Sequence, residues 1–166
     1  SLRKDRPFRQ SAGSTSIYVV TDEPDLLFAR ATAAGAQVVL SAVENGNAMG
    51  RDLSRLALWR SLGAIYVTLT HDGHNDLADS ARPKTDLGDG PEEHGGLSRL
   101  GREAIAEMNR VGLLVDVSHA SRAAMLQAAA LSRTPVVATH ACCAALRPHP
   151  RNLDDEQAFA GVNTTT

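Results

Sequence analysis

The sequence predicts an α/β fold with a parallel sheet, and three observations support this class. A helix-like segment, a glycine or proline stop and a short apolar strand follow one another four times in the 166 residues. Each of these strands is followed by a polar residue at its carboxyl end. Parallel strands need a crossover connection, and the groups at their carboxyl ends converge on one crevice. The residues placed in this way are Glu44, His71, His119 and His140.

The repeated unit fits a (β/α)₈ TIM barrel, whose catalytic groups lie at the carboxyl rim of the strands. Such a barrel needs about 250 residues, so this chain would supply about four of the eight units. An open doubly wound sheet is the alternative that the pattern leaves. We therefore expect a partial (β/α)₈ barrel over residues 17–166, preceded by a loose polar segment at residues 1–16.

The first part of the chain predicts two helices and up to three strands. Residues 17–20 are a short strand candidate, and residues 21–35 form a helix that a glycine ends. The next strand is Gln37–Val43. An amphipathic segment at residues 53–63 leads to a further strand, Ala64–Leu69.

Residues 72–96 carry glycines, prolines and charges without an apolar period, which predicts a long loop of a functional or disordered kind. Within it, His74 and Asp76 resemble an HxD metal pair, but we prefer to interpret them as part of a polar loop that lines the crevice. Ser98 then caps a helix with an apolar stripe, and Gly112 ends this helix.

The stretch Gly112–Arg151 predicts the βαβ unit around which the chain is organised. Its strands are Leu113–Val117 and Pro135–Ala138. The helix between them begins at Ser121, whose hydroxyl can accept a hydrogen bond from a first-turn amide, and it ends before the proline. A further helix is expected to begin after Arg151.

Composition excludes several classes of protein. A chain with 43% hydrophobic and 22% charged residues has the composition of a soluble globular domain. A net charge of −2 provides no basic stripe for nucleic acid. No apolar run approaches the roughly 18 residues that cross a bilayer, and the first residues lack the apolar core of a signal peptide. The compartment stays almost unconstrained, with the cytoplasm slightly favoured.

The polar residues at the strand ends suit a metal site. One glutamate and two histidines are a familiar ligand set for catalytic zinc, which lowers the pKa of bound water to about 7. Each residue taken alone is more often a hydrogen-bonded or solvated group. Arg151 follows two prolines, and a guanidinium held near a metal can clamp a carboxylate. Cys142 and Cys143 are expected to be small buried or half-buried residues, with a soft metal ligand beside His140 as the alternative.

Taken together, the motifs resemble the membrane dipeptidase family, also called renal dipeptidase or peptidase family M19. The resemblance runs from about Gln37 to Gln157. It implies a (β/α)₈ barrel with a binuclear zinc centre that cleaves dipeptides, many members tolerating a D-residue at the carboxyl end. The motifs that carry it are VENG at Val43–Gly46, LGAIYVTLTH at Leu62–His71, ADS at Ala78–Ser80, the segment Gly96–His119, and PVVATH with LRPHPRNLDDEQ within Pro135–Gln157.

The resemblance also assigns roles. Glu44 is similar to the glutamate that bridges the two metals, and His119 and His140 are similar to the remaining ligands of the second one. His71 resembles the histidine that steadies the tetrahedral intermediate and contacts the substrate, and Arg151 the arginine that binds the substrate carboxylate. The expected function is zinc-dependent dipeptide hydrolysis, with a homodimer in the full-length protein.

Three departures from the family pattern limit these expectations. The HxD pair of the family's first strand and the SDFDG-like motif of its last strand are not in this sequence, and SHSS is replaced by Thr139–Cys142. We therefore interpret the sequence as a fragment that retains at most one zinc site and has little activity alone. An inactive binding or scaffold fragment and another amidohydrolase-like metal hydrolase are the alternatives.

Overall fold

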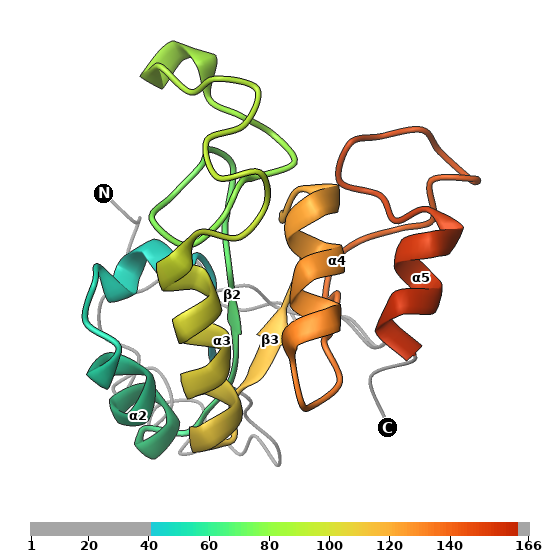
Figure 1. The fold of residues 1–166 in the computed structure, drawn as a ribbon. Helices are drawn as coiled ribbons and strands as arrows, with labels where there is room; N and C mark the ends of the chain where they lie inside the picture. The colour runs from blue at the N-terminus through green and yellow to red at the C-terminus, as the bar shows by residue number, and fades with distance from the viewer. Residues whose placement is uncertain (1–40, 163–166) are drawn as a thin grey trace, which may run out of the picture.

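The computed structural model describes residues 41–162 of the protein (Figure 1). The strand expected at residues 17–20, the helix expected at residues 21–35, and the boundary expected after residue 16 lie outside this range. Of the strand expected at Gln37–Val43, only its last three residues are described.

A parallel sheet of three strands forms the centre of the structure. Its strands are β1 (Ser41–Val43), β2 (Ala64–Thr68) and β3 (Leu114–Asp116), in the order β1-β2-β3. Val67 of β2 is paired with Val43 on one side and with Val115 on the other. The predicted α/β class with a parallel sheet is therefore confirmed.

The fourth predicted strand, Pro135–Ala138, is wrong as a strand, because only Val137 joins the sheet, through a parallel bridge to Asp116. Val137 N–H donates to Val115 O at 2.9 Å, and its carbonyl accepts from Val117 N–H at 2.8 Å. Pro135 has no N–H to donate. Beyond the bridge, Thr139 N–H donates to the Asp116 carboxylate at 3.1 Å instead of to a strand carbonyl, and so the ladder stops.

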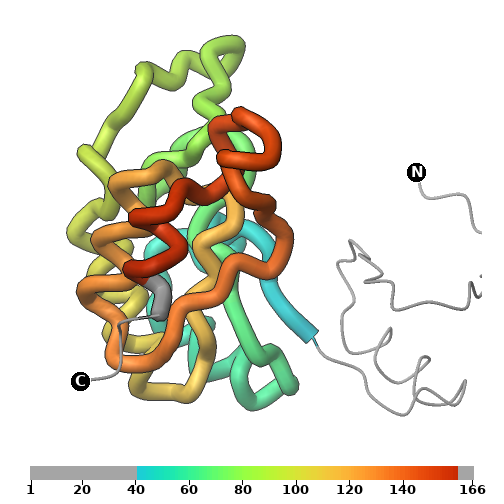
Figure 2. The backbone as a smooth tube through the Cα atoms, turned by 90° about the vertical axis from the view of Figure 1, so that its right-hand side faces the viewer, coloured from blue at the N-terminus to red at the C-terminus, as the bar shows by residue number. Residues whose placement is uncertain are grey.

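The helices lie along one side of the sheet, with α2, α3, α4 and α5 contacting one another in that order. Figures 1 and 2 show α3 and α4 on this side of the sheet. The sheet thus has the helical layer on one face that a barrel wall would have. The helices are α2 (Ser54–Ser61), α3 (Arg99–Val111), α4 (Arg122–Leu131) and α5 (Asp155–Val162), with short 3₁₀ turns at Gly46–Met49 and Thr85–Leu87.

The helix ends predicted at Ser98, Gly112 and Ser121 are confirmed. Ser98 accepts a hydrogen bond from Gly101 N–H at 3.0 Å, and Ser121 accepts one from Ala124 N–H at 3.2 Å. Gly112 ends α3 in the left-handed conformation, with φ 79°. The predicted stripe of α3 is buried against the sheet at Ala104 and at the two larger side chains that follow it, Ile105 and Met108.

The predicted long loop after β2 is present and is folded around a buried carboxylate. Asp79 accepts hydrogen bonds from the N–H groups of Glu93, His94 and Gly96 at 2.8–3.2 Å. Burial opposes the ionised form, but these hydrogen bonds outweigh it and lower the pKa of Asp79. The loop is therefore held by its own backbone (upper part of Figure 1).

The HxD-like residues of this loop do not line the crevice as we expected. His74 is buried within the loop, where its Nδ1 accepts from Ser80 N–H at 3.0 Å and its Nε2 donates to Gly90 O at 3.0 Å. Asp76 pairs instead with Arg51, at 2.8 Å. Their partners differ, so the two residues serve the loop's structure.

Within residues 41–162 no helix has the length and apolar character that a bilayer span needs.

Candidate metal centre

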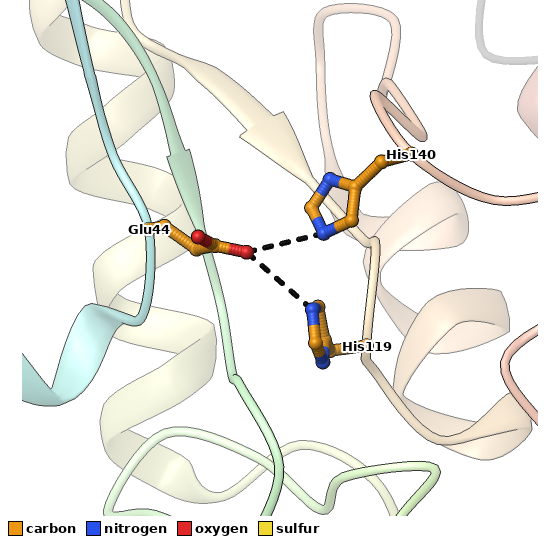
Figure 3. Close-up of side chains that lie close together, drawn as sticks. All are labelled: Glu44, His119 and His140. Carbon is orange, nitrogen blue, oxygen red and sulfur yellow. Dashed lines mark ion pairs between the residues drawn. The ribbon is translucent and has the colours of Figure 1, made fainter. Parts of the chain in front are cut away.

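The four residues predicted at the strand ends meet at one edge of the sheet. Glu44 follows β1 directly, and its Oε1 atom lies 3.1 Å from Nε2 of His140 and 3.4 Å from Nε2 of His119 (Figure 3). The same oxygen is 4.0 Å from Nε2 of His71. The ligating atoms of Glu44, His119 and His140 all lie within 4.8 Å of one another, which is close enough for them to share one ion.

Left-handed backbone marks the segments that carry two of these residues. Within residues 41–162, His119 and Asn45, the neighbour of Glu44, are the non-glycine residues with positive φ, at 70° and 78°. Asn45 Oδ1 accepts from Asn47 N–H and from the Asn75 side chain. Such conformations cost of order 1–3 kcal/mol and persist where the surroundings hold them, commonly at functional sites.

His119 has one ring nitrogen anchored and the other directed at Glu44. Its side chain is 3% exposed, and Nδ1 lies 3.2 Å from Asp72 Oδ1. Burial, followed by the charge of Arg151, lowers the pKa of His119 to about 4. The ring is therefore neutral at pH 7. Because the carboxylate of Asp72 accepts from Nδ1–H, the Nε2 lone pair faces Glu44, which is a favourable arrangement only with a cation between them.

His140 is anchored through a hydroxyl. The Thr139 hydroxyl donates to Asp116 Oδ2 at 2.9 Å, so its oxygen accepts the Nδ1–H of His140 at 2.8 Å. The backbone N–H of His140 donates to Ser118 Oγ at 3.1 Å, and Ser118 Oγ in turn donates to Asp116. Nε2 of His140 is thereby left to face Glu44.

Asp116, which holds this arrangement together, was missed by the sequence analysis. It is fully buried at the end of β3 and also accepts from the Thr68 hydroxyl, at 2.6 Å. Its position inside an apolar run led us to treat it as part of the strand. A carboxylate within such a run was the available signal, since buried charges are hydrogen-bonded or paired.

The candidate centre opens into a cleft of about 340 Å³. The ring of His71 lies against that of His119, with 4.1 Å between the centroids. Arg151 Nη2 donates to His140 O at 3.2 Å, while Arg151 Nε is buried without a hydrogen-bond partner among the described residues. The cleft is lined by Glu44, His71, Asp72, Arg82, His119, His140 and Arg151.

Two of the lining residues, Asp72 and Arg82, were also missed. Asp72 directly follows His71, and Arg82 Nη1 contacts Asp72 Oδ2 at 3.0 Å. Burial raises the pKa of Asp72, but the hydrogen bond with His119 and the charge of Arg82 outweigh burial and lower it. Asp72, His71 and His119 form a second group whose ligating atoms lie within 4.8 Å.

The two cysteines are exposed, so the expectation that they would be buried or half-buried is wrong. They lie in the loop beyond the bridge at Val137, where Cys143 forms an isolated parallel bridge with Leu153. The groups that could hold an ion among residues 41–162 contain carboxylates and imidazoles alone.

Comparison with known proteins agrees with this geometry. The model of the membrane dipeptidase family, peptidase family M19, matches residues 11–160. The dipeptidase verJ of Clonostachys rogersoniana is 42% identical over 117 residues, which are 70% of this chain and 27% of the relative. The dipeptidase aclJ of Aspergillus oryzae is 40% identical over 117 residues, which are 70% of this chain and 26% of the relative.

Solved structures give the same result. The probable dipeptidase PvdM of Pseudomonas aeruginosa has a TM-score of 0.76 and 36% identity, over 84% of this chain and 35% of that one. A metallopeptidase of Rhodobacter sphaeroides, liganded with a phosphinate mimic of L-Ala-D-Ala, has a TM-score of 0.70 and 25% identity, over 85% of this chain and 45% of that one.

The chain spans about a quarter of the length of these curated relatives. Its parallel sheet and helical layer correspond to part of the barrel of the matched structures, which confirms the predicted partial barrel. The family consists of metallopeptidases, which agrees with a carboxylate and two imidazoles at the rim. This chain belongs to the membrane dipeptidase family, peptidase family M19.

Proposed function

We propose that this protein is a zinc-dependent dipeptidase whose ion is held by Glu44, His119 and His140. The observation that carries the proposal is the approach of one Glu44 oxygen to the Nε2 atoms of both histidines, at 3.4 and 3.1 Å. Imidazole and carboxylate ligands suit zinc, and three of them leave a position open. When bound, zinc lowers the pKa of water to about 7 and polarises a carbonyl oxygen.

The neighbouring side chains suit a dipeptide. Arg151 has a buried Nε atom without a partner among the described residues, beside an Nη2 that His140 O already holds. A guanidinium fixed in this way can bind a carboxylate by donating paired hydrogen bonds to its oxygens. His71 is half exposed in the same cleft and can donate a hydrogen bond to a carbonyl oxygen that gains negative charge.

The relatives of this chain support dipeptides as the class of substrate. The Rhodobacter sphaeroides metallopeptidase is liganded with a mimic of L-Ala-D-Ala, so that dipeptide is the first substrate to test. The match to named dipeptidases favours this function over an inactive scaffold or another amidohydrolase-like enzyme. The homodimer stays a prediction from the family resemblance.

Zinc binding tests the metal assignment. The protein is dialysed against zinc, and its metal content is measured for the wild type, Glu44→Ala, His119→Ala and the control His94→Ala. Because the two groups of possible ligands among residues 41–162 share His119, which can bind one ion only, we expect at most one zinc ion per chain. We expect the first two variants to lose it and the control, an exposed loop histidine, to retain it. Zinc retained by Glu44→Ala would overturn the assignment.

Substrate binding tests the role of Arg151. With zinc present, Arg151→Ala is expected to weaken binding of the phosphinate mimic of L-Ala-D-Ala, while Arg99→Ala, on the exposed face of α3, leaves it unchanged. Hydrolysis of L-Ala-D-Ala by this chain is expected to be slow, since at most one ion assists it. A chain that binds zinc but neither mimic nor dipeptide would favour the scaffold alternative.

A further inference from the structure

We infer that Asp72 is a positioning residue of the metal centre, which orients the His119 ring and fixes its hydrogen on Nδ1. The inference rests on the proposed function in taking His119 as a metal ligand. Asp72 Oδ1 lies 3.2 Å from His119 Nδ1, and Asp72 Oδ2 lies 3.0 Å from Arg82 Nη1. Arg82, Asp72 and His119 thus form a row of contacts. It ends at Nδ1 of His119, while the other ring nitrogen, Nε2, faces Glu44.

The hydrogen-bonding capacity of each group determines where the hydrogen lies. Arg82 can only donate, and an ionised carboxylate can only accept. His119 must therefore carry its hydrogen on Nδ1, which leaves the lone pair on Nε2, 3.4 Å from Glu44. Metal-bound histidines are commonly held by a carboxylate in this way, and losing that partner costs about 10–100-fold in metal affinity.

The loop that carries Asp72 also holds the backbone of His119. The His119 carbonyl accepts hydrogen bonds from Ala81 N–H at 2.8 Å and from Ser80 Oγ at 3.3 Å. These contacts fix the left-handed backbone of His119, whose φ is 70°. They act on the backbone alone. The buried ring packs against the ring of His71, and Asp72 supplies the hydrogen-bond partner of its Nδ1 atom.

Direct metal ligation by Asp72 is the competing interpretation, because Asp72, His71 and His119 also lie close together. Two features oppose it. The Arg82 guanidinium already places a positive charge against the Asp72 carboxylate. A neutral imidazole also has a single lone pair, so His119 cannot bind one ion beside Glu44 and another beside Asp72.

The experiment compares zinc affinity, measured by competition with a chelator, among variants of this loop. We expect Asp72→Ala to bind zinc about 10–100-fold more weakly with unchanged stoichiometry. Asp76→Ala is the matched control, since it removes another carboxylate paired with an arginine from the same loop and should leave the affinity unchanged. An Asp72→Ala variant with wild-type affinity, or one that loses a whole equivalent of zinc, would overturn the inference.

Asp72→Asn gives a sharper test, because it changes the chemistry and keeps the shape. With its amide oxygen facing Arg82, its NH₂ group donates to Nδ1 and forces the hydrogen of His119 onto Nε2. Zinc binding should then fall at least as far as in Asp72→Ala. Adding Arg82→Ala frees the amide to turn, and the double variant should regain part of the affinity. A double variant that binds no better than Asp72→Asn would contradict this mechanism.

Nitrogen chemical shifts of His119 in the metal-free protein provide a readout that does not need zinc. We expect the Nδ1–H tautomer in the wild type and the Nε2–H tautomer in Asp72→Asn. If the wild type bound no zinc, the proposed function would fail, while these shifts would still decide the role of Asp72. Equal tautomer populations in both proteins would overturn the inference.

Discussion

In the candidate centre, the position of one hydrogen atom on each of the two imidazoles decides which ring nitrogen can bind a metal. His119 is anchored on Nδ1 by a carboxylate from the loop after β2, and His140 by a hydroxyl that Asp116 holds. Both Nε2 atoms then face the same oxygen of Glu44. The anchors come from different strands, so the site depends on residues that are not themselves ligands.

His71 is expected to serve the reaction without holding the metal. Its Nε2 lies 4.0 Å from Glu44, farther than those of the other two histidines. Replacing His71 by alanine in the full-length protein should lower kcat for L-Ala-D-Ala by about 10²–10³-fold, the usual cost of one lost oxyanion donor. Zinc content, measured alongside, should stay nearly unchanged. Loss of zinc in this variant would refute the assignment.

Asp79 should make the stability of the protein depend on acid. Its pKa is lowered in the folded state, so its contribution is present above the unfolded value of about 3.9 and is lost as pH falls below it. Asparagine offers a single oxygen to the three N–H groups of Glu93, His94 and Gly96. We expect Asp79→Asn to reduce the free energy of unfolding at pH 7 by about 1–3 kcal/mol.

Urea unfolding at pH 7 and pH 3 checks this expectation. The wild type should lose stability in acid, and Asp79→Asn should lose less. Asp86→Asn, which changes an exposed carboxylate of the same loop, is the control and should behave as the wild type. An Asp79→Asn variant with the full acid sensitivity of the wild type would show that other carboxylates dominate.

Among the elements, α3 owes its position to a close approach at Gly101. A Cβ atom built at Gly101 would lie 2.0 Å from the carbonyl oxygen of Leu77. In an open helix, replacing glycine by alanine would stabilise by about 1 kcal/mol. Here the clash is with backbone that cannot rotate away, so Gly101→Ala is expected to destabilise the protein by about 1–3 kcal/mol or more.

Thermal and urea unfolding measure the effect of Gly101→Ala. The matched control is Gly90→Ala, whose Cβ would meet Glu92 O at an ordinary 3.6 Å. Stability of Gly101→Ala equal to that of the wild type would mean that the loop moves away from α3 at little cost.

The elements also show what the sequence could and could not predict. The caps at Ser98 and Ser121 and the glycine end of α3 depend on neighbouring residues, and all three were predicted. The strand at Pro135–Ala138 was wrong, because its pairing is decided by Asp116, which takes the Thr139 N–H. Asp72 was missed for a similar reason, since its partner His119 is distant in sequence.

In the molecule as a whole, the residues of the candidate centre come from segments that differ in how fully they are paired in the sheet. β2 is paired on both sides, whereas the segment that carries His140 joins the backbone ladder of the sheet through one bridge at Val137, and beyond it is held by side-chain hydrogen bonds of Asp116 and Ser118. Figure 3 shows Glu44 reaching toward His119 and His140 from the opposite side of the site. An ion bound between these side chains would therefore link the paired strands to the segment around Val137 and His140, which is the edge of the sheet with the least pairing.

Zinc is accordingly expected to stabilise the edge of the sheet most. Free zinc at 100 times its Kd should raise the free energy of unfolding by about 2.7 kcal/mol.

In hydrogen exchange, the amides of β2 should be slow with or without zinc, because both neighbours protect them. The amides of Val137 and His140 should exchange faster without zinc and slow markedly when it is added, since His140 then becomes a ligand. In Glu44→Ala the same addition should leave their exchange unchanged. Protection that appears equally in β2 and at the edge, or that persists in Glu44→Ala, would place the ion elsewhere than between these three side chains.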